Sequence, residues 1–268
     1  MGIKLINKKH NGFDNFRIGL GKRIFDIIFS SIALLIVSPF LLITAISIKL
    51  TSKGPVFYKS LRVGTGYDIF EFYKFRTMYK GADKERARLS ELNEYLISHK
   101  EKQSDFTNIE DCPDCEEGKP CSPILYIDGI EICENLYLRK KRLMLLETTF
   151  FKVKDDPRIT PIGNFLRSTH FDEFPQFINV IKGDMSIVGN RPLPLYEAEK
   201  LTTDEWSYRF LAPAGITGLW QVDKNNSMKA ENRVRLDNKY AMVAGFSEDL
   251  LIILKTIPAL FRLRRSSY

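Results

Sequence analysis

The chain has 268 residues, of which 44% are hydrophobic and 27% charged, and its formal net charge is +7. This composition excludes a disordered tail, a fibrous protein and a small disulfide-rich scaffold, and the length allows one or two domains with a hydrophobic core. Residues 1–80 contain 13 Lys and Arg against 4 Asp and Glu, whereas residues 81–135 contain 6 against 14. Because the basic excess flanks a hydrophobic segment, we attribute it to anionic lipid and expect no nucleic acid partner.

Residues 27–48 contain no charged side chain and are about 33 Å long as a helix, enough to cross a hydrocarbon core of about 30 Å. Basic residues lie on both sides, so the positive-inside rule assigns both flanks to the cytoplasm. Near the middle, Pro39 removes a backbone N–H and bends the helix, and the Ser38 hydroxyl can satisfy the freed carbonyl. We therefore predict a re-entrant membrane helix hairpin over residues 22–52, behind a basic tail of residues 1–21. A bitopic helix with a tolerated kink is the alternative.

Residues 55–78 predict a small β-hairpin, with two apolar-rich strands around a turn at residues 64–66. Leucines at helical spacing among many charges predict a surface helix over residues 84–102. The acidic stretch that follows, residues 103–135, contains all four cysteines of the chain.

The strongest candidate for chemistry is the pair of adjacent carboxylates Asp172 and Glu173. A helix is predicted from about Asp172 to Ile181, because Pro175 is tolerated only in its first turn. Exposed N–H groups at a helix start keep a carboxylate ionised and attract phosphate. An ionised Asp is a usable nucleophile toward phosphorus, and its neighbour can hold a divalent metal or move a proton. Such pairs are common as simple caps, but this one accompanies cations suited to phosphate. They are Lys74, Arg76, Arg158, Arg167 and Arg191.

The last helix is predicted to begin at Ser247, a good N-cap followed by Glu248 and Asp249 in the first turn. It continues to about residue 265, and its apolar body and terminal arginines suit a helix on a membrane surface. A buried helix of the core is the alternative.

Short motifs in a fixed order cover residues 20–80 and 152–260. They are Lys22-Arg23, Asp26, Ser38-Pro39, Gly54-Pro55-Val56-Phe57, Arg62-Val63-Gly64, Lys74-Phe75-Arg76-Thr77-Met78, Asp156-Pro157-Arg158-Ile159-Thr160, Gly163, Leu166-Arg167, Asp172-Glu173-Phe174-Pro175-Gln176, Asn179-Val180, Gly183-Asp184-Met185-Ser186-Ile187-Val188-Gly189, Arg191-Pro192, Pro213 and Gly215-Ile216-Thr217-Gly218-Leu219-Trp220-Gln221-Val222. In these motifs the chain resembles the bacterial sugar transferase family, the monotopic polyprenyl-phosphate sugar-1-phosphate transferases or phosphoglycosyl transferases, in the small form without extra transmembrane helices.

The resemblance implies an enzyme that transfers a sugar-1-phosphate from a UDP-sugar to polyprenyl (undecaprenyl) phosphate, the first membrane step of a surface glycan pathway. It places the enzyme on the cytoplasmic face of the bacterial inner membrane as a monotopic protein, in contact with lipid and beside pathway glycosyltransferases. Asp172 matches the family's nucleophile, which forms a covalent aspartyl-phosphosugar intermediate with release of UMP. Glu173 matches the partner carboxylate linked to Mg²⁺ and to proton handling, so Mg²⁺ is expected at both. Candidates for the nucleotide side are Pro213, Gly215, Thr217 and Gln221.

The fold class that follows is α+β and mostly helical, with a catalytic domain over residues 53–80 and 152–268 and interfacial helices. The chain departs from the family pattern at His170-Phe171 and at Asn190, and it carries an acidic insertion at residues 81–151. Two other functions stay open: a membrane-associated nucleotide-sugar hydrolase with water as acceptor, and a non-enzymatic membrane-anchored interaction module. The sequence specifies neither the sugar nor the oligomeric state.

The insertion holds the pattern Cys112-x2-Cys115-x5-Cys121-x11-Cys133. On the cytoplasmic face these thiols stay reduced, which disfavours disulfides. Four thiolates could close a tetrahedral structural Zn²⁺ site and so explain how a segment with few core residues folds. Unliganded thiols are the alternative, since only the first pair has the short spacing. In either case the insertion is expected to serve docking or regulation rather than chemistry.

Overall fold

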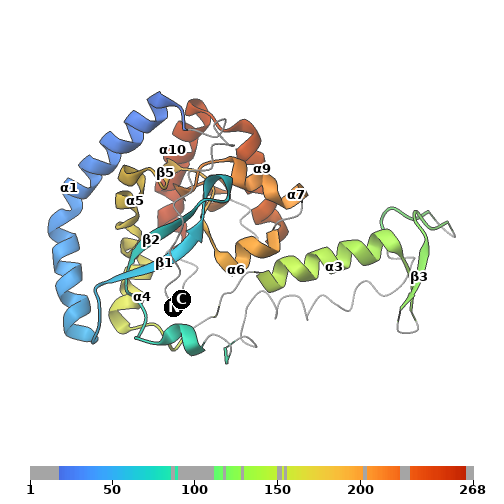
Figure 1. Cartoon of the computed structure of the whole chain (residues 1–268), viewed down its shortest axis with the longest axis horizontal. Coiled ribbons are helices and arrows are strands. Elements are labelled where there is room, and N and C mark those ends of the chain that lie inside the picture. Colours follow the sequence, from blue (N-terminus) through green and yellow to red (C-terminus); the bar gives the residue numbers. More distant parts are fainter. Residues whose placement is uncertain are drawn as a thin grey trace, which may run out of the picture.

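The computed structural model combines helices with small sheets (Figure 1). It describes residues 18–85, 88–89, 112–116, 119–127, 130–149, 153, 156–201, 204–223 and 230–263. The predicted mixture of helix and sheet is confirmed. Most of the surface helix predicted over 84–102 lies outside the described residues, which include only a 3₁₀ turn at Ala82–Glu85 and residues 88–89 in that region.

The predicted β-hairpin is confirmed as β1 (Phe57–Val63) and β2 (Ile69–Phe75), antiparallel and joined through a 3₁₀ turn at Thr65–Tyr67. Gly66 lies in this turn with φ of 59°, a conformation that glycine adopts without steric cost. A third strand, β6 (Leu193–Pro194), pairs with the other edge of β1. The sheet thus joins the N-terminal hairpin to the chain just after Arg191.

The apolar segment forms one uninterrupted helix, α1 (Leu20–Thr51), with Pro39 inside it. A hairpin with a turn at Ser38-Pro39 is therefore not confirmed; Figure 1 shows instead a helix that bends around the body of the protein. The Ser38 hydroxyl donates to the Leu35 carbonyl at 2.8 Å, the carbonyl that an N–H at position 39 would otherwise have bonded. The predicted role of Ser38 is thus confirmed, and this hydrogen bond is why the helix continues through the proline. By length and composition α1 could cross a membrane.

Both ends of α1 are fastened to the same body. Near its start, the buried Asp26 accepts from the backbone N–H of Ile187 at 3.1 Å, and Arg23 donates to the Ile181 carbonyl at 2.6 Å. Near its end, Ile48 packs with Phe75 and Leu166 in a small core cluster. The middle of α1 is left to expose large apolar side chains, among them Ile32, Leu35, Ile36, Phe40, Leu42 and Ile43.

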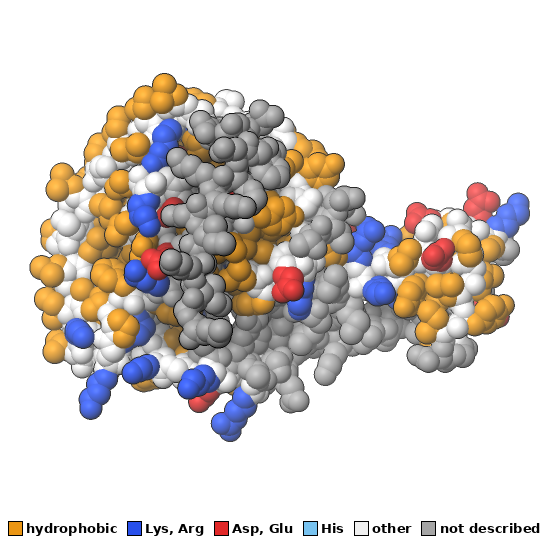
Figure 2. Space-filling view, in the orientation of Figure 1, with side chains coloured by type: hydrophobic (Ala, Val, Ile, Leu, Met, Phe, Trp, Pro, Cys, Tyr) orange, Lys and Arg blue, Asp and Glu red, His pale blue; other side chains and the backbone are white. Residues whose placement is uncertain are grey.

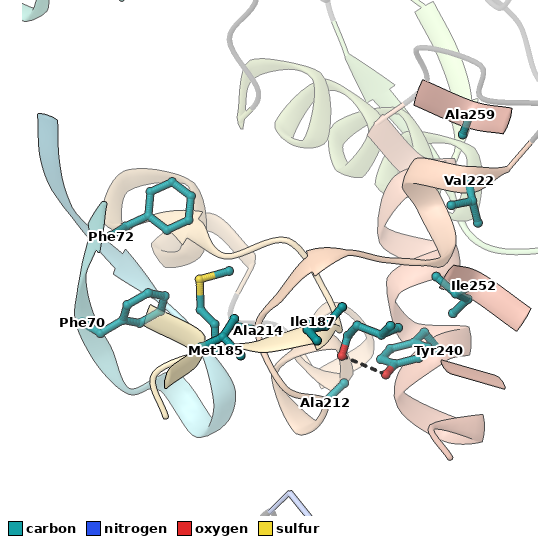
Figure 3. Close-up of a cluster of buried hydrophobic side chains, with 12 residues drawn as sticks. Phe70, Phe72, Met185, Ile187, Ala212, Ala214, Val222, Tyr240, Ile252 and Ala259 are labelled. Atoms are coloured by element: carbon teal, nitrogen blue, oxygen red, sulfur yellow. Dashed lines mark hydrogen bonds between the residues drawn. The ribbon is translucent and has the colours of Figure 1, made fainter. Parts of the chain in front are cut away.

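The main core surrounds a parallel pair of strands, β5 (Ser186–Val188) and β7 (Gly215–Thr217). Figure 3 shows this core extending from Phe70 and Phe72 of β2 through Met185 and Ile187 to Tyr240, whose hydroxyl donates to the Val188 carbonyl at 3.2 Å. The two strands approach closely: a Cβ added at Gly215 would lie 2.1 Å from the Gly189 nitrogen.

Two long helices close this core, α9 (Ala230–Val243) and α10 (Phe246–Leu263). The last helix begins at Phe246, one residue before the predicted start, with Glu248 and Asp249 in its first turn as expected. Ile252 and Ala259 of α10 are buried in the core, whereas several apolar residues on other faces are exposed: Leu250, Leu251, Leu254 and Ile257. One face of α10 is therefore part of the core, as the alternative prediction expected, and another apolar face of the helix is exposed to solvent.

The remaining elements are short, apart from α3. They are β3 (Ile124–Ile127), β4 (Ile130–Cys133), α3 (Glu134–Thr149), α4 (Pro161–Ser168), α5 (Gln176–Lys182), α6 (Leu195–Ala198), α7 (Asp204–Ser207) and α8 (Leu219–Val222). The start of α4 is fixed by Thr160, whose Oγ1 accepts from the Gly163 N–H at 3.0 Å, and by Pro161 in the first turn. In Figure 1, α3 extends away from the body and carries the β3–β4 hairpin at its far end.

Candidate active site

The two carboxylates lie in a 3₁₀ turn, Phe171–Glu173, between α4 and α5. The prediction that Asp172 caps the following helix is wrong, because α5 begins at Gln176 with Pro175 at its N-cap. The hydrogen bonds of the turn end with that from the Phe174 N–H to the Phe171 carbonyl, because Pro175 has no N–H with which to continue them. The turn is preceded instead by His170, which adopts a left-handed conformation with φ of 57°. His170 thus reverses the chain after α4 and brings the pair back over the sheet.

Two cations from separate elements meet at Glu173. Lys74 Nζ of β2 lies 2.6 Å from Oε1 of Glu173 and 3.5 Å from Oδ2 of Asp172. Arg191 follows β5 in the chain, and its Nη2 donates to the same Oε1 of Glu173 at 2.9 Å. Burial alone would raise the pKa of Glu173, but the charges of Arg191 and Lys74 outweigh it and hold that pKa well below its usual range. Both carboxylates are largely buried, with side chains 8% and 15% exposed.

The position of Lys74 relative to the pair is set by Asn179 of α5. Its Oδ1 accepts from the Tyr73 N–H at 3.1 Å, and its Nδ2 donates to the Glu71 carbonyl at 2.6 Å. Both partners belong to β2, so the fully buried Asn179 fastens the helix after the carboxylates to the strand that carries Lys74. Sequence reasoning placed Asn179 in a motif without giving it this role.

The other three predicted cations lie at different distances from the pair. Arg167 of α4 donates from Nε to Thr77 Oγ1 at 2.9 Å. Burial lowers its pKa, while the carboxylate of Asp172 acts in the opposite direction, so the two side chains interact. Arg158 is buried and donates from Nε to Asp156 at 2.8 Å. The charge of Arg158 also contributes to lowering the pKa of Arg167, so the two guanidinium groups are near each other, but the ion-pair partner of Arg158 is Asp156.

Arg76 is placed elsewhere. Its Nη2 donates to the Ser52 carbonyl at 2.7 Å and to the Ser52 hydroxyl at 2.6 Å, at the C-terminal end of α1. The side chain is buried, and its described contacts join α1 to the sheet. Phosphate binding by Arg76 therefore stays a prediction, and the role visible in its contacts is to cap a helix end.

The four nucleotide-side candidates separate into two groups. Pro213 lines a small pocket together with Asn190, Arg191 and Phe210, so it lies beside the cations. The others make interior contacts of the β5–β7 layer. Thr217 Oγ1 lies 2.8 Å from Thr256 Oγ1, Gln221 Nε2 donates to the Ile216 carbonyl at 3.1 Å, and Gly215 faces Gly189.

Three residues outside the predicted set belong to this neighbourhood. Burial and the charge of Arg191 lower the pKa of Arg62, and the charge of Glu197 contributes to raising the pKa of Arg191. Asn190, a departure from the family pattern, is buried and donates to the carbonyls of Arg209 at 2.8 Å and Asp237 at 2.9 Å. Arg62 belongs to a motif that the chain shares with the family and Asn190 is a departure from the family pattern, so both were detectable in the sequence; the position of Glu197 depends on packing.

The carboxylate pair has the donor chemistry of a magnesium site. Mg²⁺ is bound in proteins by one or two carboxylates together with substrate phosphates. The contacts of Lys74 and Arg191 with Glu173 both use Oε1, so Oε2 is the oxygen through which Glu173 would reach a metal. The residues present therefore fit Mg²⁺.

A buried pair of carboxylates set among lysine and arginine side chains is a site for handling phosphate esters, and here it lies beside a long apolar helix. The chain belongs to the bacterial sugar transferase family, whose model matches residues 18–263. It is accordingly an enzyme of the phosphoglycosyl transferase type.

Curated relatives carry names that agree with this family. The chain is 32% identical over 250 residues to the exopolysaccharide production protein ExoY of Rhizobium meliloti, covering 93% of this chain and 89% of that one. It is 33% identical over 242 residues to the undecaprenyl-phosphate galactose phosphotransferase of Salmonella typhimurium, covering 90% of this chain and 40% of that protein. It is 29% identical over 243 residues to a UDP-glucose:undecaprenyl-phosphate glucose-1-phosphate transferase of Klebsiella pneumoniae, covering 88% of this chain and 39% of that protein.

Proposed function

We propose that this enzyme transfers a sugar-1-phosphate from a UDP-sugar to polyprenyl phosphate, in the first membrane step of a surface glycan pathway. The observation that carries the proposal is the buried Asp172-Glu173 pair beside Lys74, Arg191 and Arg167. The relatives named as undecaprenyl-phosphate sugar phosphotransferases support the choice of both substrates.

In the first step a carboxylate oxygen of Asp172 attacks the β-phosphorus of the UDP-sugar. A bond forms between that oxygen and the phosphorus, and the bond from the phosphorus to the bridging oxygen breaks, so that UMP leaves with the electron pair. In the second step an oxygen of polyprenyl phosphate attacks the same phosphorus, and Asp172 leaves as a carboxylate. The product is a polyprenyl diphosphate sugar, and neither step needs an oxidant or a reductant.

The neighbouring side chains have separate tasks. Lys74 lies within reach of both carboxylates and Arg191 contacts Glu173, so both cations are placed to stabilise negative charge on the transferred phosphoryl group. Because its pKa is held well below its usual range, Glu173 stays ionised at neutral pH. It is thus better suited to holding the cations and a metal than to proton transfer. When bound at the pair, Mg²⁺ would neutralise charge on the diphosphate.

The same proposal places the enzyme on the cytoplasmic face of the bacterial inner membrane as a monotopic protein. Both ends of α1 are tied to one body and its middle exposes apolar side chains, which supports a re-entrant path into one leaflet. Figure 2 shows hydrophobic side chains along the edge of the molecule that α1 occupies. Basic residues on both flanks of the helix agree with cytoplasmic ends.

The test is UMP release from a panel of UDP-sugars by the detergent-solubilised protein with Mg²⁺, with and without undecaprenyl phosphate. We expect sustained release that requires the lipid and is lost in Asp172→Asn. The matched control is Asp68→Asn, an exposed aspartate of the hairpin turn, which should keep wild-type activity. Equal release without lipid would make the enzyme a hydrolase, and an active Asp172→Asn or the absence of UMP with every sugar would contradict the proposed reaction.

A further inference from the structure

The four cysteines of the insertion come together at one point. Their Sγ atoms all lie within 4.8 Å of one another, and all four thiols are free. Cys121 Sγ lies 3.8 Å from Cys112 Sγ and 3.9 Å from Cys133 Sγ. Four sulfurs around one zinc ion, with Zn–S bonds of about 2.3 Å, are separated by about 3.8 Å. Disulfide-bonded sulfurs lie at about 2.05 Å, so the spacing excludes disulfides among the four and fits ligands of one metal ion.

The four sulfurs belong to a tight turn and to the β3–β4 hairpin. Cys112 and Cys115 flank a tight turn, in which the Cys115 N–H donates to the Cys112 carbonyl at 3.1 Å. Cys121 precedes β3, and Cys133 ends β4 opposite Ile124. Two ligands thus come from the Cys112–Cys115 turn, and the β3–β4 pairing sets the other two, one just before β3 and one at the end of β4.

Nitrogen donors already point at these sulfurs. The Cys121 backbone N–H donates to Cys115 Sγ at 3.3 Å, and Asn135 Nδ2 lies 3.6 Å from Cys121 Sγ. Donors of this kind orient thiolates and stabilise their charge when they bind a metal.

The hydrophobic core of the hairpin is small in the part of the chain that the structure describes. Its buried members are Cys112, Ile132, Cys133 and Leu136, and the partly buried residues packed against them are Cys115, Leu125, Ile127 and Tyr137. The sheet has only two strands of four residues each, which is marginal without further support. Figure 1 shows it at the far end of α3, away from α4 and α5 and hence from the carboxylate pair. A small unit of this kind folds when a metal adds to its core.

We propose that Cys112, Cys115, Cys121 and Cys133 bind one structural zinc ion as a closed tetrathiolate, and that this ion folds the arm formed by residues 112–142. Four sulfur ligands leave no open position for a substrate or a water molecule, so the ion has no part in phosphoryl transfer. Tetrahedral sulfur ligation is also used by iron centres, so iron is measured together with zinc; a closed four-cysteine site in a small unit is typical of structural zinc.

The experiment measures zinc by mass spectrometry in the full-length protein, purified in detergent with a reductant. We expect one zinc per chain in the wild type and nearly none in Cys115→Ser and Cys121→Ser. The matched control is Tyr126→Ser, on the exposed face of β3 in the same arm, which should keep its zinc. These readouts do not use transferase activity, so they succeed or fail independently of the proposed reaction.

A second measurement covers the case in which the cysteine variants fail to fold. Wild-type protein stripped with a chelator and loaded with Co²⁺ should show the sulfur-to-cobalt charge-transfer and visible bands of a tetrahedral tetrathiolate. Zinc should also protect all four thiols from a thiol reagent and the arm from limited proteolysis. Stoichiometric iron, disulfides in the freshly reduced protein, or thiols that react equally fast with and without zinc would each overturn the proposal.

Discussion

Replacing Glu173 by Gln removes the negative charge shared by Lys74 and Arg191. Lys74 then keeps only Asp172, 3.5 Å away, and Arg191 loses the carboxylate with which it forms an ion pair. The side chains are 15% exposed for Glu173, 18% for Lys74 and 32% for Arg191, so the cluster lies between a buried and a surface ion pair. Removing one partner costs about 3–5 kcal/mol in the buried case, and exposed pairs contribute about 0–1 kcal/mol. We therefore expect a loss of about 2–3 kcal/mol in the free energy of unfolding. For a domain of this size that lowers Tm by about 4–12 °C.

The lowered pKa of Glu173 also predicts how this loss of stability changes with pH. The folded-state pKa of Glu173 lies well below 4.5, its ordinary value, so its stabilising contribution is complete above about pH 4.5 and is lost as the pH falls further toward the folded value. The Tm difference between wild type and Glu173→Gln should thus be full at pH 7 and shrink below about pH 4.5.

Differential scanning fluorimetry in detergent, between pH 7 and pH 4, measures both effects. The matched control is Glu71→Gln, an exposed partner of Lys59 on the same strand as Lys74, which should shift Tm far less. The double variant Glu173→Gln/Arg191→Met should recover part of the loss, because it removes the guanidinium that has lost its ion-pair partner. An unchanged Tm for Glu173→Gln at pH 7, or a difference that grows as the pH falls, would show that the two cations do not hold this carboxylate.

Two further predictions concern the core. Gly215→Ala places a Cβ 2.1 Å from the Gly189 nitrogen and should lower the free energy of unfolding by at least about 1–3 kcal/mol, measured by chemical denaturation. The control is Gly21→Ala in helix α1, where the added Cβ meets nothing within 4 Å; it should be neutral or raise stability by up to about 1 kcal/mol. If both variants unfold alike, the strands are not so close. Asp237→Asn leaves the buried Arg209, 2.9 Å away, without its counter-charge and should lower the free energy of unfolding by about 3 kcal/mol. The double variant Asp237→Leu/Arg209→Met should be closer to wild type in stability, because no unpaired charge remains. An Asp237→Asn variant as stable as wild type would contradict this ion pair.

Local signals predicted much of the fold. The hairpin over residues 55–78 followed from apolar strands around a glycine turn, and the start of α10 was correct to one residue because Glu248 and Asp249 mark a first turn. The strand β6 has only two residues and exists because it meets the free edge of β1, so nothing in its own sequence could indicate it. The course of α1 was predicted as a break at Pro39, but the Ser38 hydrogen bond lets the helix continue and bend.

In the site too, some residues could be found from the local sequence, whereas others are recognised only by their contacts with distant parts of the chain. The carboxylates could be found from the sequence because they are adjacent, and Lys74 and Arg191 because they stand in short polar motifs. Arg76 has the same sequence character as Lys74, but it lies just after β2 and its side chain contacts the end of α1. Alternation along a strand would put residues 74 and 76 on the same face, so the difference arises from the packing of α1 and not from the local sequence. Asn179 and Arg62 take their roles from contacts across the sheet, which sequence spacing does not reveal.

The attachment of α1 also sets an order of events during biosynthesis. Lys22 contacts Asp249, 227 residues later in the chain, and Asp26 needs the backbone of Ile187. The described helix α1 therefore acquires these polar partners only after Ile187 and Asp249 have been synthesised. With the membrane path proposed for α1, the bilayer would surround its exposed apolar side chains during that interval. Insertion of α1 would then precede these long-range contacts, which form slowly because they join residues far apart in the chain.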